Sequence, residues 1–130
     1  MSKFSCSCGN VIALNEYPTA FEGWLLGCEA EEYFEDEISR QIADFYEAVR
    51  QDAKERWVEA FYGHAAELAG DAEIICDIVR RVKQRYLVAV IECPSCGRLS
   101  IQRAPGAGHY AFFIPEQQGY NGILKGLQRI

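Results

Sequence analysis

Several features that would place this chain in a familiar class are missing from its sequence. No stretch of roughly 18 or more apolar residues occurs, which excludes a transmembrane helix and a membrane partner. The first residues, Met1–Cys6, lack the apolar core of a signal peptide, so we expect a cytoplasmic protein. No internal repeat, low-complexity tract or linker divides the 130 residues, and this length is typical of a single domain.

The motifs of common enzymes are also absent. The sequence contains only two histidines, His64 and His109, which we interpret as surface or capping residues. It has no glycine-rich phosphate loop, no His-Glu-x-x-His motif and no nucleophile with an evident base partner. The carboxylates between Glu29 and Glu37 are explained by the start of a helix, because the positive end of the helix dipole favours acidic side chains. We therefore predict that the protein is not an enzyme.

Cysteine, by contrast, is more abundant than core packing requires. The six cysteines are too few for a disulfide-dense secreted scaffold, and clustered cysteines in a reducing compartment bind metal more often than they form disulfides. Four of them form two compact pairs, each followed by a glycine. Four thiolates at about 2.3 Å from the ion make a closed tetrahedral zinc site. We predict that a structural Zn²⁺ is bound by Cys6, Cys8, Cys93 and Cys96.

The two pairs resemble the knuckles of the zinc-ribbon family, in which two cysteine turns clasp one zinc ion. The resemblance covers residues 3–14 and 86–103, and the second pair fits the family's C-P-x-C-G pattern through Cys93, Pro94, Cys96 and Gly97. The first pair has one residue between its cysteines where the ribbon usually has two. The resemblance implies a small antiparallel sheet with a long insertion of 84 residues between the pairs. Loop-closure entropy tolerates this insertion because it grows slowly with length.

Other interpretations of the cysteines stay open. Four thiolates also hold iron in a rubredoxin-type site, and the sequence does not separate the two metals. The Cys-Pro-Ser-Cys segment at 93–96 is also similar to a glutaredoxin-type redox motif. That chemistry places the nucleophilic cysteine at the start of a helix, whereas residues 97–101 favour a strand. We interpret Cys28 and Cys76 as small buried residues, with a catalytic or sensory thiol as the alternative for Cys28.

The apolar pattern predicts an α+β fold. Apolar residues at spacings of three and four predict a helical face over residues 31–62, either as one helix that ends at Gly63 or with a break near 49–52. A shorter helix is expected over 71–84, with Asp71 as its cap. Strands are expected within 3–14 on either side of the first cysteine turn, and at 86–92, 99–103 and 110–114, while residues 21–26 are ambiguous between strand and loop.

These elements combine into one predicted domain. A helical insertion, residues 29–84, interrupts a small antiparallel sheet of zinc-ribbon type that is formed by residues 3–14 and 86–114. Residues 117–130 show no clear period, and we expect them to form an irregular tail.

Charge is unevenly distributed along the chain. Residues 1–70 hold 14 acidic and 5 basic side chains, whereas residues 71–130 hold 5 acidic and 8 basic ones, within a net charge of −6. An acidic helix with aromatic residues predicts docking of a basic protein partner, since complementary charge speeds association. These aromatic residues are Tyr33, Phe34, Phe45, Tyr46, Trp57 and Tyr62. In size and charge the chain resembles bacterial immunity proteins, which implies inhibition of a basic toxin.

Nucleic-acid binding is the alternative function, because zinc ribbons often bind nucleic acid. The acidic isoelectric point, near 4.9, and the lack of a dense basic stripe oppose this function. A local basic face is still available from Arg80, Arg81, Lys83, Arg85, Arg98 and Arg103.

Overall fold

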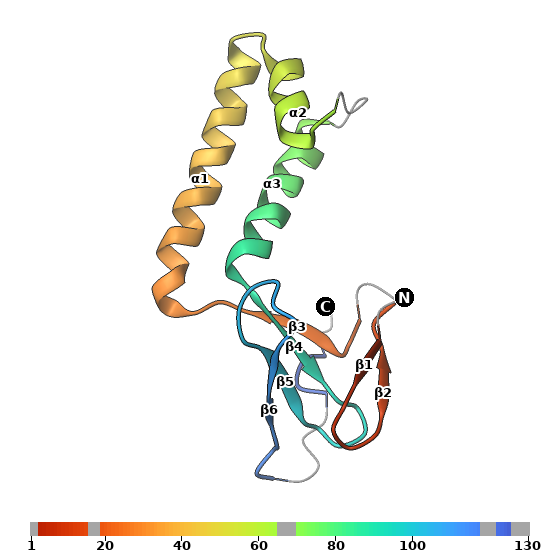
Figure 1. Ribbon diagram of the computed structural model, residues 1–130. Helices are drawn as coiled ribbons and strands as arrows, with labels where there is room; N and C mark the ends of the chain where they lie inside the picture. Colours follow the sequence, from red (N-terminus) through yellow and green to blue (C-terminus); the bar gives the residue numbers. More distant parts are fainter. Residues whose placement is uncertain (1–2, 16–18, 65–69, 118–121, 126–130) are drawn as a thin grey trace, which may run out of the picture. The chain divides into compact units, whose positions relative to one another are not determined.

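The computed structural model describes residues 3–15, 19–64, 70–117 and 122–125 (Figure 1). The chain divides into two compact units, which are described separately below. We call residues 27–86 the helical unit, and residues 1–26 together with 87–130 the cysteine unit. The expectation of one domain stays a prediction, and most of the tail at 117–130 lies outside the described residues. None of the described helices is long and apolar enough to cross a membrane.

The helical unit contains α1 (Cys28–Arg50), α2 (Lys54–Tyr62) and α3 (Asp71–Tyr86). Helices α1 and α3 pack side by side, and α2 also contacts α1 (Figure 1). The long periodic segment is therefore two helices, as the alternative with a break anticipated. Between them Asp52 has a φ of 57°, in the left-handed region that Asp tolerates better than most residues. Gly63 ends α2 as predicted, with a φ of 79° and its N–H bonded to the carbonyl of Glu59.

The core of this unit follows the predicted apolar spacing. Ile74, Ile78 and Val82 recur every four residues along α3 and are fully buried. They form the core together with the buried side chains of Phe45 from α1 and Val58 from α2. Partly buried side chains from all three helices surround them: Phe34, Ile38, Ile42, Trp57, Phe61, Tyr62, Ile75 and Tyr86. The unit therefore has an apolar core of its own.

This core contains most of the aromatic residues that were expected to face a partner. Four of the six pack within it: Phe34, Phe45, Trp57 and Tyr62. Only Tyr33 and Tyr46 are largely exposed, at 68% and 64%. The spacing of three and four residues correctly predicted one apolar face of a helix. The same spacing is expected for a buried face and for an exposed aromatic surface, so it did not distinguish between them.

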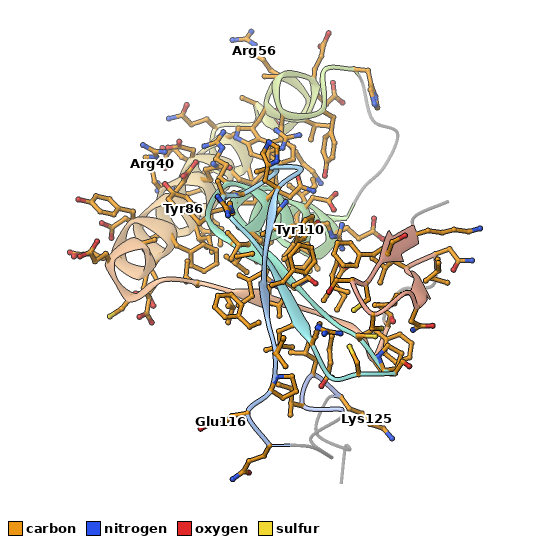
Figure 2. All side chains as sticks on the ribbon, turned by 60° about the horizontal axis from the view of Figure 1, so that its bottom comes forward. Arg40, Arg56, Tyr86, Tyr110, Glu116 and Lys125 are labelled. Carbon is orange, nitrogen blue, oxygen red and sulfur yellow. The ribbon has the colours of Figure 1, made fainter. Side chains whose placement is uncertain are left out.

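Polar contacts also join the helices of this unit. The carboxylate of Glu37, buried in α1, accepts hydrogen bonds from the Arg85 guanidinium and from the Tyr86 hydroxyl, the latter at 2.7 Å. The bond to Glu37 raises the pKa of Tyr86. Asp71 is the first residue of α3 rather than its cap, and its carboxylate lies 2.6 Å from Nζ of Lys54. Figure 2 labels Tyr86 among the side chains of this unit.

The two isolated cysteines are exposed, so the expectation that they are buried is wrong. Cys76 lies two residues from both Ile74 and Ile78, which places it about 200° around the helix from each of these buried residues. Cys28 is the first residue of α1, where its side chain is accessible to solvent.

The cysteine unit consists of two small antiparallel sheets. Strands β1 (Lys3–Ser5) and β2 (Val11–Ala13) form one of them. The other has the order β3-β4-β5-β6, formed by Glu22–Leu25, Val88–Glu92, Leu99–Gln102 and Tyr110–Phe113. The ambiguous segment at 21–26 is thus a strand, and it pairs with the buried, β-branched strand β4. These sheets and the helical stretch between the cysteine pairs confirm the predicted α+β fold.

Candidate metal centre

The two cysteine turns converge in the cysteine unit. The Sγ atoms of Cys6, Cys8, Cys93 and Cys96 all lie within 4.8 Å of one another. The Sγ–Sγ distance is 3.6 Å between Cys6 and Cys96 and 3.7 Å between Cys8 and Cys93. These distances greatly exceed a disulfide bond of about 2.05 Å. They match the edges of about 3.8 Å in a tetrahedron of four sulfurs, each about 2.3 Å from a zinc ion. The cluster therefore has the size and composition of a metal site.

Both turns close with the same pair of backbone hydrogen bonds. In the first, the carbonyl of Cys6 accepts from the N–H of Gly9 and the N–H of Cys6 donates to the carbonyl of Asn10, both at 2.9 Å. In the second turn, the carbonyl of Cys93 accepts from the N–H of Gly97 and the N–H of Cys93 donates to the carbonyl of Arg98, also both at 2.9 Å. Each of these bonds spans one residue more than its counterpart in the first turn. The shorter spacing of the first pair is therefore accommodated within the turn.

A glycine makes each of these turns possible. Gly9 has a φ of 97° and Gly97 a φ of 76°, in the left-handed region where a side chain is strained. The glycine that follows each cysteine pair in the sequence is thus required by the backbone of the turn.

Each turn contributes one buried and one more accessible cysteine to the cluster. Cys6 and Cys93 are 5% and 1% exposed, whereas Cys96 is half-buried and Cys8 is exposed. The buried pair packs with Ile12 of β2 and the partly buried ring of Phe21, among other apolar residues. The cluster is therefore anchored in the core of its unit and open to solvent at Cys8, where an ion can enter.

The surroundings of the second turn favour the thiolate form. Burial raises the pKa of Cys6 to about 11. Burial acts in the same direction on Cys93 and Cys96, but hydrogen bonds to their sulfurs outweigh it. Backbone N–H groups at Ser95 and Cys96 lower the pKa of Cys93, and donors that include the backbone N–H of Arg98 lower that of Cys96 to about 6. Because the thiolate is the form that binds metal, these donors prepare the turn for an ion.

Two polar side chains contact the cluster in a way that the sequence did not indicate. Nδ2 of Asn10 lies 3.8 Å from Sγ of Cys93, and Nη1 of Arg98 lies 3.5 Å from Sγ of Cys96. Asn10 reaches the sulfur of the opposite turn, whereas Arg98 contacts its own turn. Each residue comes directly after the glycine of its cysteine pair, and this shared position was the available signal.

The redox alternative does not fit this geometry, and neither histidine belongs to the cluster. The turn at Cys93–Cys96 leads into strand β5, so it lacks the helix that a glutaredoxin-type motif requires. His109 lines a separate cavity at the start of β6, and His64 follows the end of α2 in the helical unit. Among the described residues, the group with metal-ligand geometry is the cysteine cluster itself.

A buried carboxylate directly precedes the second turn. Glu92, at the end of β4, is 1% exposed and accepts hydrogen bonds from three consecutive backbone N–H groups, at 3.0–3.3 Å, in residues 122–124. Leu124 of this segment packs over Gly23 of β3, where an added Cβ would lie 3.3 Å from its Cδ2. Glu92 thus attaches a distant segment to the strand that carries Cys93. The signal for it was an acidic residue at the end of an apolar strand.

Replacing this carboxylate with an amide is expected to weaken the cysteine unit. Glu92→Gln removes the charge and leaves a single oxygen acceptor, so the free energy of unfolding should fall by about 2–3 kcal/mol. Chemical denaturation measures the effect. Glu116→Gln, which alters an exposed carboxylate of the same unit, is the matched control and should change stability little. Equal stability of the two variants would contradict the anchoring role of Glu92.

Comparison with known proteins shows the family to which the chain belongs. The model of a domain of unknown function, DUF8617, matches residues 2–117. The matched part includes all four clustered cysteines and every described helix and strand. No curated protein and no solved structure matches the chain significantly. The chain belongs to the DUF8617 family, a domain whose function is unknown.

Proposed function

We propose that the protein is a non-catalytic, zinc-stabilised interaction domain whose acidic helical unit binds a basic protein. The observation that carries the metal part is the group of four sulfur atoms within 4.8 Å. Four thiolates complete a tetrahedral shell and leave no position for water or substrate, so the ion is structural rather than catalytic. Thiolate ligands accept zinc or iron, and metal analysis of the purified chain is expected to find one zinc ion per chain.

Charge supports the partner part of the proposal. The helical unit holds fifteen acidic against eight basic residues, a net charge of −7, whereas the cysteine unit holds four against five, a net of +1. The acidic excess of the chain therefore belongs to the helices. Such a field attracts a basic partner and raises its association rate.

The exposed face at the start of α1 is the best candidate for the contact. We call its four residues the acidic patch: Glu29, Glu32, Tyr33 and Asp36. They follow the helical spacing of three, four and seven residues, so they share one face, and all four are exposed. Of the acidic residues between Glu29 and Glu37, the first turn of α1 contains only Glu29 and Glu31. Because the effect of the helix dipole falls off beyond the first turn, the explanation of all these carboxylates by the start of a helix is too broad. Tyr33, with 68% of its surface exposed, adds a rigid aromatic side chain of the kind that anchors protein interfaces.

An inhibitor of a basic toxin would use these features directly. A small acidic protein neutralises such a partner by covering its cationic surface, which requires complementary charge and no chemical reaction. The resemblance to immunity proteins in size and charge supports this form of the proposal. The zinc site would then serve stability.

Charge reversal tests the acidic patch. The double variant Glu32→Lys with Asp36→Lys is expected to weaken capture of the basic partner from the native host by about tenfold or more. Capture by wild type should be lost in high salt, because exposed charge pairs are screened. Quantitative mass spectrometry of proteins cross-linked to each bait measures both effects.

The matched control makes the same charge change elsewhere in the helical unit. Glu55 and Glu59 are exposed acidic residues of α2, and reversing both should leave capture largely intact. A protein captured equally by wild type and both double variants, or equally in low and high salt, would contradict the proposal.

The basic residues of α3 give little support to nucleic-acid binding. Nη1 of Arg80 lies 2.7 Å from the carboxylate of Asp77, and the guanidinium of Arg81 lies 3.6 Å from the centre of the Phe61 ring. Arg85 is bonded to Glu37. Three of the four predicted cations on this helix are thus engaged within the unit.

A further inference from the structure

A second candidate site lies in the cysteine unit, apart from the sulfur atoms. A cavity of about 660 Å³ opens between β1 and the hairpin of β5 and β6. Sites for small molecules commonly measure about 300–1,000 Å³. Aromatic residues from β1 and β6 line the cavity, including Tyr110, which is labelled in Figure 2. Arg103, Gly108 and His109 line it from the hairpin loop.

The aromatic residues form one surface of the cavity. The rings of Phe4 and Tyr110 meet edge to face with their centres 4.9 Å apart, and the ring of Phe112 lies 6.4 Å from that of Phe4. Tyr110 and Phe112 are two residues apart on β6, so they share one face of the sheet. Phe112 is 51% exposed, which leaves its ring available for stacking against a planar ligand.

Arg103 and His109 lie at the loop end of the same cavity. The backbone N–H of Arg103 donates to the carbonyl of His109 at 2.9 Å. This bond continues the pairing of β5 with β6 beyond Gln102 and Tyr110, so Arg103 and His109 lie opposite each other. Both are exposed, and within the described part of the chain no carboxylate pairs with Arg103. The sequence from Cys93 to Pro115 contains no acidic residue at all. A guanidinium in such surroundings suits a phosphate, which it contacts with two parallel hydrogen bonds.

We propose that this cavity binds a nucleotide, either free or as one unit of a single strand. The base stacks on the aromatic surface beside Phe112, and the phosphate lies at Arg103 and His109. Because the ligand combines a planar ring with an anion, neither a nucleoside nor inorganic phosphate alone satisfies both ends of the cavity. The site is independent of the proposed basic partner, since it lies in the other unit of the chain.

Titration of the full, zinc-loaded chain, monitored by NMR, tests this site. The probes are adenosine monophosphate, adenosine, inorganic phosphate and an oligoadenylate of about ten nucleotides. We expect the mononucleotide to shift the amide signals of Phe4, Arg103, His109 and Phe112, with at least about tenfold weaker binding of adenosine and of phosphate. Equal affinity for the mononucleotide and the strand identifies a free nucleotide as the ligand, whereas much tighter strand binding identifies nucleic acid.

Matched variants separate stacking and charge from general damage. Phe112→Leu should weaken nucleotide binding about fivefold or more. Phe113→Leu changes a ring of similar exposure, 53%, that lines a different depression, and it should leave binding unchanged. Arg103→Gln should weaken binding about tenfold, with Lys125→Gln, another exposed cation of this unit, as its control.

The melting temperature of each variant verifies that it folds, and Arg103→Lys provides a second, milder change that should retain part of the affinity. Shifts confined to other surfaces, no shifts with any nucleotide probe, or unchanged binding by folded Arg103→Gln would overturn the proposal.

Discussion

Replacing Cys93 with serine is expected to abolish zinc binding and to lower the free energy of unfolding of the cysteine unit by about 5 kcal/mol or more. Cys93 is 1% exposed, and its sulfur lies 3.7 Å from that of Cys8. A serine hydroxyl remains protonated near neutral pH and is a poor ligand for zinc. The variant therefore leaves three clustered thiols, of which Cys6 is buried, without an ion to hold them together.

The two turns are far apart in the sequence, which makes the loss larger. The ion would join residues 6–8 to residues 93–96 across the whole helical insertion. Without the ion, sheet β1–β2 would lose this link to the four-stranded sheet. Mass-spectrometric metal analysis and thermal unfolding, each with and without a chelator, measure the two effects.

Two exposed cysteines provide controls for this variant. Cys28→Ser and Cys76→Ser make the same chemical change outside the cluster and should retain a full complement of zinc. Their melting temperatures should equal that of the wild type. A wild-type chain purified under reducing conditions without metal, or a Cys93→Ser variant with wild-type stability, would refute the zinc site.

The second large effect is expected in the helical unit. Ile78→Ala should lower the free energy of unfolding by about 2–5 kcal/mol, because it removes buried methyl groups and leaves a cavity. Ile78 is fully buried at the centre of α3, in a core with Phe45 of α1 and Val58 of α2. Urea denaturation followed by circular dichroism measures the loss of helix directly.

Cys76→Ala is the matched control on the same helix, since its exposed side chain leaves no cavity. Zinc content under native conditions should be unchanged in both variants, because all four cysteines of the cluster lie in the cysteine unit. A folded Ile78→Ala protein that has lost its zinc, or that is as stable as the control, would contradict this expectation.

The candidate metal ligands could be identified from the sequence because the signal is local. Two cysteines followed by a glycine specify a tight turn, and Gly9 and Gly97 adopt the left-handed conformation that such turns need. The same is true of Gly63, which ends α2 where the pattern placed the end of the helix. The short strands around the first turn were also predicted correctly, since an apolar run and turn residues are encoded over a few positions.

Other features depended on residues that meet only in the folded chain. The sequence shows that Arg81 is a basic residue, but it does not show that its guanidinium lies over the ring of Phe61 in another helix. This contact occupies Arg81 within the helical unit. The sequence around Glu92 does not indicate that its carboxylate accepts hydrogen bonds from three backbone N–H groups in residues 122–124. Residues 21–26 became a strand because β4 offered an edge with which to pair.

The sequence by itself determined the turns, the helical periods and the set of four thiols that can bind a metal, because each depends on neighbours a few residues apart. The tertiary structure alone decided which aromatic and cationic side chains remain free. Tyr33 and Phe34 illustrate the physical reason: they are adjacent and chemically similar, but the helix turns them about 100° apart. Packing of α1 against the other helices then covers Phe34 and leaves Tyr33 exposed.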